Sequence, residues 1–156
     1  MAMARNTAAS AVAPGTEWPV YDQATGQQEP QDHFVTRNGV EFAGTHLIID
    51  FWEAENLDNL ELMETALREA VEVSGATLLH IHLHHFTPSG GISGIAVLAE
   101  SHISVHTWPE RNFAAFDVFM CGDTEPELTI PVLKSTFNPG KLNVNEQLRG
   151  INPERT

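Results

Sequence analysis

The chain has little cysteine, little positive charge and no long hydrophobic run. Its single cysteine cannot form a disulfide within the chain, which favours a reducing compartment, and we expect a cytoplasmic protein. The 8 basic residues stand against 21 acidic ones, and the net charge of −13 excludes binding to nucleic acid, which requires clustered Lys and Arg. The same charge is compatible with a small cationic substrate. No apolar stretch is long enough to cross a bilayer, and the Ala-rich start lacks the apolar core of a secretory signal, so we expect no membrane contact.

The length and the composition indicate one folded domain. The 156 residues can bury a hydrophobic core, and 42% of them are hydrophobic, as in globular proteins. Residues 1–38 are rich in Ala, Gln, Thr, Pro and Gly and show no helical or strand periodicity, which predicts a poorly ordered N-terminal extension. The folded domain is therefore expected to start near Gly39 and to cover residues 39–156.

Hydrophobic periodicity predicts a series of strands interrupted by two helices. A first helix begins at Asp58, which has capping-box spacing with Glu61, and it ends at Ser74-Gly75. A second helix is expected over residues 125–137, where Pro131 should start, kink or break it. The predicted strands cover residues 46–52, 77–84, 92–99, 102–107, 113–121 and 142–148. Runs of strands with single helices between them predict the α+β class, as a two-layer sandwich with one mostly antiparallel sheet and the helices packed on one face.

Reactive side chains are concentrated between Glu100 and Cys121. Ser101 follows Glu100 directly and is a possible nucleophile, while His106 can move a proton and Cys121 can donate one or act as a thiolate. The offset of five residues from Ser101 to His106 does not place both on one strand face, so the two meet only if the chain bends or breaks at Ser101. A surface serine, a hydrogen-bonded histidine and a packed cysteine are the plainer interpretations of the same residues.

A second cluster lies on the strand predicted at 77–84. Alternation places one set of side chains on each face: Leu79, Ile81 and Leu83 on one, and His80, His82 and His84 on the other, with His85 beside them. Imidazoles at i and i+2 lie about 7 Å apart and can bind zinc or iron if another element supplies a ligand, such as His46, Glu100 or Cys121. The competing interpretation, polar side chains on a solvent or interface face, is preferred here, and no metal is expected.

Five segments together resemble the prokaryotic pyruvoyl-dependent S-adenosylmethionine decarboxylase family. The segment AESHISVHTWPE, followed at this distance by FAAFDVFMCG, is highly specific to that family. The resemblance covers residues 40–125 well and the last part of the chain weakly. The matching segments are GTHLIIDFWEA (Gly44–Ala54), Ser74–Thr77, Gly91–Gly94, Ala99–Glu110 and Phe113–Gly122.

The resemblance implies a proenzyme that cuts itself between Glu100 and Ser101 into chains of residues 1–100 and 101–156. The Ser101 hydroxyl would attack the Glu100 carbonyl, and elimination and hydrolysis would leave a covalent pyruvoyl group as the cofactor. By analogy with the family, His106 accepts the proton during processing and Ser93 assists it. An unusual local backbone conformation is needed for such an attack.

The resemblance also implies the reaction and its partners. The pyruvoyl ketone would form a Schiff base with the α-amine of S-adenosylmethionine and act as an electron sink, and Cys121 would return the proton. Phe86 looks like the residue that stacks on adenine, with His106 as a possible second wall, and Glu110 looks like the residue that holds the ribose hydroxyls. The product would be the aminopropyl donor for spermidine synthesis, and a homodimer is expected with pockets near the subunit interface.

Three other functions are left open by the residues. A pyruvoyl-dependent decarboxylase could take a basic amino acid such as ornithine or arginine, because the α-amine chemistry does not define the side chain. A metal-binding module would use the three imidazoles of His80, His82 and His84. A cysteine hydrolase would use Cys121 with His106 and would keep the chain uncut.

Overall fold

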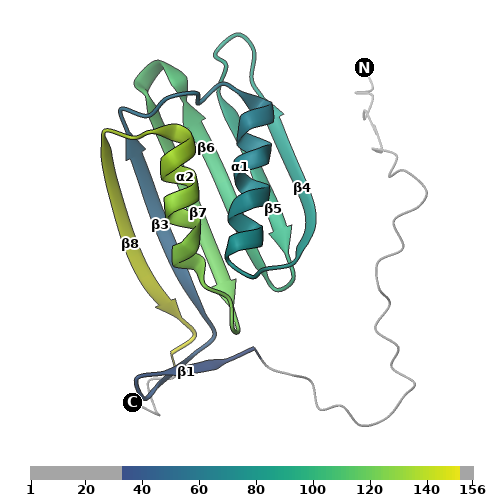
Figure 1. The fold of residues 1–156 in the computed structure, drawn as a ribbon, viewed down its shortest axis with the longest axis vertical. Coiled ribbons are helices and arrows are strands. Elements are labelled where there is room, and N and C mark those ends of the chain that lie inside the picture. The colour runs from purple at the N-terminus through teal and green to yellow at the C-terminus, as the bar shows by residue number, and fades with distance from the viewer. Residues whose placement is uncertain (1–32, 152–156) are drawn as a thin grey trace, which may run out of the picture. The chain divides into compact units, whose positions relative to one another are not determined.

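The computed structural model describes residues 33–151, which form a six-stranded antiparallel sheet, a two-stranded hairpin and two α-helices (Figure 1). The strands are β1 (Val35–Arg37), β2 (Val40–Phe42), β3 (Gly44–Trp52), β4 (Leu78–His85), β5 (Ile92–Leu98), β6 (Ser101–Trp108), β7 (Phe113–Cys121) and β8 (Lys141–Arg149). The helices are α1 (Leu60–Val73) and α2 (Thr129–Phe137), with short 3₁₀ turns at η1 (Pro109–Arg111) and η2 (Pro126–Leu128).

Both α-helices lie on the same face of the large sheet, whose strand order is β4-β5-β6-β7-β3-β8 (Figure 1). Every neighbouring pair in that order is antiparallel. This confirms the predicted two-layer α+β fold. The two middle strands bear the predicted reactive residues, with Ser101 and His106 on β6 and Cys121 on β7, so the sheet fixes the positions of those residues.

The core lies between the sheet and the helices. Alternate residues of the central strands point into it, as the period of two requires, and the helices add a buried stripe that includes Met63, Leu67 and Phe137. Fully buried side chains from the strands include Ile49, Phe51, Ile103, Val105, Phe116 and Val118. Burial of such side chains contributes about 1.5–3 kcal/mol each, and this holds the strand registers that place the site.

The start of α1 differs from the prediction by one residue. Asn59, not Asp58, is the N-cap, and its side chain accepts a hydrogen bond of 3.0 Å from the backbone nitrogen of Leu62. The helix ends at the predicted Ser74-Gly75, where Gly75 has a φ of +74°. Helix α2 begins at Thr129, later than the predicted start at residue 125, because residues 126–128 form the 3₁₀ turn η2. Pro131 lies in the first turn of α2, where the missing N–H costs no hydrogen bond, so it does not break the helix.

The face assignment predicted for Leu79 was wrong. A β-bulge between Leu78 and His80 interrupts the pairing of β4 with β5. As a result Leu78, Ile81 and Leu83 pack against the core, and Leu79 is exposed. The bulge shifts the phase of the alternation by one residue, which a strict period of two cannot anticipate.

A hairpin precedes the large sheet where the sequence predicted an extension. Strand β1 lies before Gly39, so regular structure forms within the predicted extension. The remainder of that extension, residues 1–32, lies outside the described residues. Asn38 and Gly39 form its turn with φ values of +51° and +82°, the conformation that an Asn-Gly pair favours in a tight hairpin. The hairpin brings the segment around His33 to one end of the large sheet.

The face of the sheet opposite the helices is uncovered by any described element. It carries exposed apolar side chains from several strands: Ile48, Trp52, Ile95 and Trp108. Imidazoles from β3, β4 and β6 share this face with them. Among residues 33–151, no helix has both the length and the apolar character needed to span a bilayer.

Candidate active site

The predicted cleavage position lies in the tight turn between β5 and β6. Leu98 pairs with Ser101, so the loop consists of Ala99 and Glu100 alone. Glu100 has a φ of +56°, a left-handed conformation that costs a residue with a side chain about 1 kcal/mol. Ser101 is the first residue of β6 and is 8% exposed, on the core side of the strand. The peptide bond between Glu100 and Ser101 thus sits at a strained turn with a nearly buried hydroxyl next to it.

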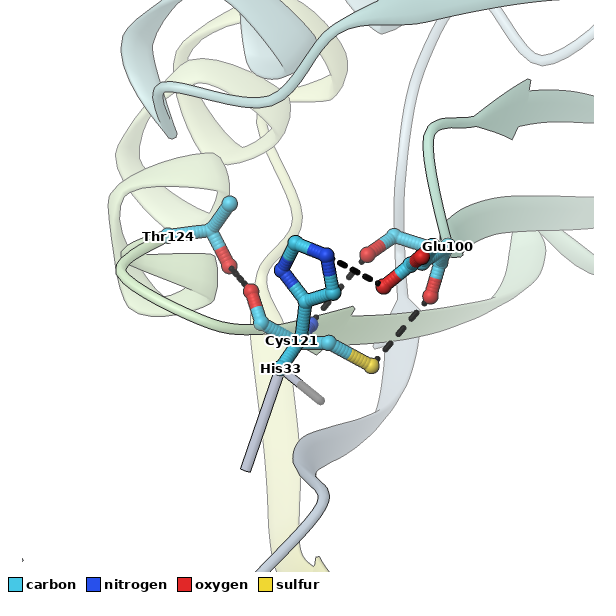
Figure 2. A network of polar contacts seen from close by, with 5 residues as sticks. His33, Glu100, Cys121 and Thr124 are labelled. Carbon is cyan, nitrogen blue, oxygen red and sulfur yellow. Dashed lines mark hydrogen bonds and ion pairs between the residues drawn. The ribbon is translucent and has the colours of Figure 1, made fainter. Parts of the chain in front are cut away.

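Cys121 contacts both residues of that peptide bond (Figure 2). Its backbone nitrogen donates to the Ser101 Oγ at 3.2 Å, and its thiol donates to the Glu100 carbonyl oxygen at 3.2 Å. Burial raises the pKa of the Cys121 thiol, the Glu100 carboxylate raises it further, and a hydrogen bond with Ser101 partly opposes the rise. The thiol is therefore held in the protonated form, in which it can donate a hydrogen bond or a proton.

The other predicted residues gather around a pocket at the opposite end of β6. Its volume is about 270 Å³. The lining residues are Phe86, Ser89, Gly91, Ser93, His106, Thr107, Trp108 and Glu110. All four predicted residues from this part of the chain, Ser93, His106, Phe86 and Glu110, are among them.

Ser93 and His106 form a hydrogen-bonded pair in this pocket. They are cross-strand partners between β5 and β6, and Ser93 Oγ lies 2.8 Å from His106 Nδ1. A hydroxyl at Nδ1 orients the imidazole and leaves its Nε2 for another group. The pair is suited to accept a proton from a hydroxyl brought to Nε2.

Phe86 and Glu110 flank the pocket from two loops. The Phe86 ring packs edge-on against His84 with 4.5 Å between the ring centroids, and Phe86 is largely exposed. Its backbone is fixed by hydrogen bonds with Gly90 and Gly91, both 2.8 Å long. Glu110 lies in the short turn η1 that follows β6. An aromatic ring and a carboxylate on opposite loops can bind a ligand that has both a planar group and hydroxyls.

Trp108 and Thr107 are pocket residues that the sequence did not single out as site residues. Trp108 faces the pocket from the end of β6, with its ring 6.3 Å from that of His106. The buried Thr107 hydroxyl accepts from the Ile92 nitrogen and donates to the Leu57 carbonyl, both at 2.8 Å. Alternation along the HTW segment could have indicated Trp108, because it shares the open face with His106.

Ser101 and His106 do not meet within one chain. Strand β6 runs unbroken from Ser101 to Trp108, so the bend that a direct contact requires is absent from the described strand. Five residues at about 3.3 Å each separate the two by about 16 Å. They also point to opposite faces, since Ser101 is buried on the core side and His106 is exposed. The site therefore consists of two halves at the two ends of one strand.

The same separation bears on the cysteine-hydrolase hypothesis. His106 pairs with Ala115 of β7, whereas Cys121 lies six residues further along that strand. At about 3.3 Å per residue, the thiol and the imidazole are about 20 Å apart within one chain. A thiolate–imidazole pair of the kind that a cysteine hydrolase uses does not form within the described chain.

The histidines of β4 do not form a metal site among the described residues. His80, His82 and His84 are exposed on the edge strand of the sheet, with no further ligand gathered near them in residues 33–151. His46 lies on β3, which is separated from β4 by three strands. Its Nε2 contacts Asp117 Oδ1 at 3.2 Å instead.

The centre of the open face carries a polar network around that contact. The Ser104 hydroxyl donates to Asp117 Oδ2 at 3.2 Å, and His102 lies edge-on to His46. Burial lowers the pKa of His102, the nearby His46 lowers it further, and Asp117 partly opposes the shift. The polar network of Ser104 and Asp117 therefore lies between exposed apolar side chains of the neighbouring strands, Ile95 and Ile48.

The fold and the site together define a two-layer α+β protein with a serine, a thiol and a strained peptide bond at one end of its sheet and a small-molecule pocket at the other. The family model described as S-adenosylmethionine decarboxylase matches residues 45–150. The chain belongs to this family, which confirms the resemblance found in the sequence.

Individual relatives agree with this assignment. The chain is 46% identical over 109 residues to the S-adenosylmethionine decarboxylase proenzyme of Thermomicrobium roseum, covering 69% of this chain and 94% of that protein. It is 46% identical over 111 residues to the proenzyme of Methanococcus maripaludis strain C5, covering 69% of this chain and 90% of that protein. The crystal structure of the adenosylmethionine decarboxylase from Aquifex aeolicus VF5 matches with a TM-score of 0.65 and 30% identity, covering 74% of this chain and 97% of the other.

Proposed function

We propose that the chain is a self-processing, pyruvoyl-dependent decarboxylase that acts on S-adenosylmethionine. The observation that carries the proposal is the arrangement at the β5–β6 turn. Glu100 is in a left-handed conformation, and its carbonyl accepts a hydrogen bond from the Cys121 thiol beside the Ser101 hydroxyl. In this proposal residues 39–156 form the decarboxylase domain, and the chain is cut within it, after Glu100, into chains of residues 1–100 and 101–156. The lone cysteine favours the cytoplasm as its location.

Processing begins when the Ser101 Oγ attacks the Glu100 carbonyl carbon. The amide C–N bond breaks, an ester forms, and the α-amine of residue 101 is released. Loss of the Cα proton of residue 101 then expels the Glu100 carboxylate and leaves a dehydroalanine. Addition of one water and loss of one ammonia convert this residue into the pyruvoyl group. The strained turn favours the first step, because the attack relieves an unfavourable backbone conformation.

The Cys121 thiol stabilises the charge that develops in this attack. Negative charge forms on the Glu100 carbonyl oxygen, which already accepts a hydrogen bond from Sγ at 3.2 Å. A donor aimed at a developing oxyanion typically contributes about 2.7–4 kcal/mol when it belongs to the backbone or an amide, and a weakly polar thiol contributes less. The raised pKa of Cys121 keeps the proton on sulfur during this step.

A second copy of the chain supplies the proton acceptor in this proposal. His106 and Ser93 of the same chain are too far from Ser101, about 16 Å along the strand. The open face of the sheet has exposed apolar residues that require cover, including Ile48, Ile95 and Trp108. A two-fold axis between two such faces that runs across the strands places the His106 end of one chain beside the Glu100–Ser101 turn of the other, where Cys121 lies on the open-face side of β7. The homodimer then completes two sites, each with residues from both chains.

The substrate is held by the pocket residues of the partner. Phe86 provides a ring for the adenine, and the carboxylate of Glu110 accepts from the ribose hydroxyls. The net charge of −13 favours a sulfonium or ammonium ligand over an anionic one. These three features fit a cationic nucleoside.

Cys121 has a second role after processing. A pyruvoyl group at position 101 supplies a ketone that withdraws electrons as the substrate carboxylate leaves. Its neighbour Cys121 then donates a proton to the substrate α-carbon. Burial keeps the thiol protonated for this step. The product is decarboxylated S-adenosylmethionine, an aminopropyl donor for spermidine synthesis.

Release of labelled carbon dioxide from three carboxyl-labelled compounds tests the proposal. We expect turnover of S-adenosylmethionine and none of ornithine or arginine, and we expect S101A to be inactive. Turnover of ornithine or arginine instead would replace the nucleoside by a basic amino acid and leave the self-processing chemistry in place. Full activity of S101A would overturn the pyruvoyl mechanism itself.

A further inference from the structure

An N-terminal arm, here defined as residues 33–43, docks against the cleavage site. It precedes the region that matches the family model, which begins at residue 45. The Gly122 nitrogen donates to the His33 carbonyl at 3.1 Å, and Arg37 donates to the Thr124 carbonyl at 3.3 Å. Gly122 has a φ of +63°, and a Cβ added there would lie 3.4 Å from His33 Nδ1. The arm is thus held against the residues that follow Cys121.

The arm brings one imidazole to the residue whose peptide bond is to be cut. His33 Nε2 lies 3.0 Å from Glu100 Oε2, and Figure 2 shows this contact beside the thiol that reaches the carbonyl of the same residue. Glu100 is therefore contacted twice, through its carboxylate by His33 and through its carbonyl oxygen by the Cys121 thiol. The mechanism proposed above assigns no role to the imidazole of His33.

We propose that His33 is a positioning residue for self-cleavage, which acts by pairing with the Glu100 carboxylate. This inference rests on the proposed function. The attack of Ser101 creates negative charge on the Glu100 carbonyl oxygen, and a free carboxylate on the same residue opposes that charge. A protonated His33 neutralises the carboxylate and fixes the side chain of a residue held in a left-handed conformation.

The surroundings of Glu100 support an electrostatic role for this pair. The charge of Glu100 already acts on the neighbouring thiol, because it is one of the causes that raise the pKa of Cys121. The backbone of both residues is also held, because the Glu100 carbonyl accepts from the Cys121 thiol and the His33 carbonyl accepts from the Gly122 nitrogen. Among the described residues, His33 is the one whose ring contacts this carboxylate.

The arm also joins the two product chains. After cleavage, His33 and Glu100 belong to the chain of residues 1–100, whereas Gly122 and Thr124 belong to the chain of residues 101–156. The hydrogen bonds from Gly122 to His33 and from Arg37 to Thr124 therefore cross from one product to the other. Together with the pairing of β5 and β6, they hold the two product chains to each other without a covalent link.

The test follows the cutting of newly translated full-length chains over time on denaturing gels. We expect H33A to be cut about three- to fivefold more slowly than the wild type, the scale of a half-exposed ion pair. H33K restores the cation and should recover most of the rate. Substitution T36A, at an exposed position on the same arm, is the matched control and should leave the rate unchanged.

Coupling to Glu100 separates this inference from a purely structural role of the arm. In the E100Q background there is no carboxylate to neutralise, so H33A should have no further effect on the rate. Equal slowing by H33A in both backgrounds, or an H33A chain cut at the wild-type rate, overturns the inference. Failure of the wild type to be cut, or cutting of S101A, overturns the proposed function instead.

Discussion

Mixed dimers of two inactive variants test the division of the site between two chains. Ser101 and Cys121 lie at one end of β6, and His106 and Ser93 lie at the other, on the open face. The separation of about 16 Å exceeds the reach of a proton transfer, which needs about 3 Å. S101A and H106A should therefore each be inactive alone, while a dimer of one S101A chain with one H106A chain keeps one complete site.

The expected recovery follows from random assembly. About half of the dimers formed from equal amounts of the two variants are mixed, and each has one complete site out of two, so about a quarter of the wild-type activity should return. Co-expression with two different tags, purification over both and a decarboxylation assay measure the recovery per mixed dimer. S101A with C121A is the matched control, because both changes fall in the same half of the site and no complete site forms. Doubly tagged S101A/H106A dimers with no activity would refute the shared site.

Three further outcomes are expected. C121S should still be cut, but its decarboxylation rate should fall about 100-fold. The wild-type rate should decline at alkaline pH, and only above the usual thiol range, because the pKa of Cys121 is raised. A pH–rate profile of C121S should lack this decline. E110Q should raise KM for S-adenosylmethionine about tenfold while the rate of self-cleavage stays unchanged, measured by steady-state kinetics and gel analysis. T107V leaves the buried Ile92 N–H and Leu57 carbonyl without their partner and should lower the free energy of unfolding by about 2–3 kcal/mol, measured by denaturant titration.

The sequence predicted the sheet and helices well because their patterns are strong. Residues 113–121 alternate between buried and half-buried positions along the whole of β7, as the period of two requires. The apolar spacing over residues 60–71 likewise identified α1, whose buried residues include Met63 and Leu67. Patterns of this kind depend only on the burial of one face of the element, so they can be recognised without knowing which strands pair with each other.

Two features of the fold were missed for different reasons. The turn at Asn38-Gly39 carried a hairpin signal, but the surrounding residues 1–38 were assigned as one extension on composition. The bulge at Leu79 has no comparable signal, because it depends on how β4 pairs with β5. The hairpin could therefore have been predicted from the local sequence, whereas the bulge could not, because it depends on the pairing of two strands.

The sequence predicted which residues belong to the site but not how they are arranged in space. The period of two already separated Ser101 from His106, whereas the contact of His106 with Ser93 depends on the register of β5 against β6. The contact of His33 with Glu100 depends on the path of the arm across the end of the sheet. Contacts between residues so distant in the chain leave no periodic signal in one sequence.

The intact mass of the freshly purified full-length protein tests the central claim most directly. We predict two chains, one ending at Glu100 and one beginning at position 101, the latter lighter by one ammonia than a chain that begins with serine. S101A should give one uncut chain. A single unbroken wild-type chain, or a second chain that begins with an intact serine, would contradict the account.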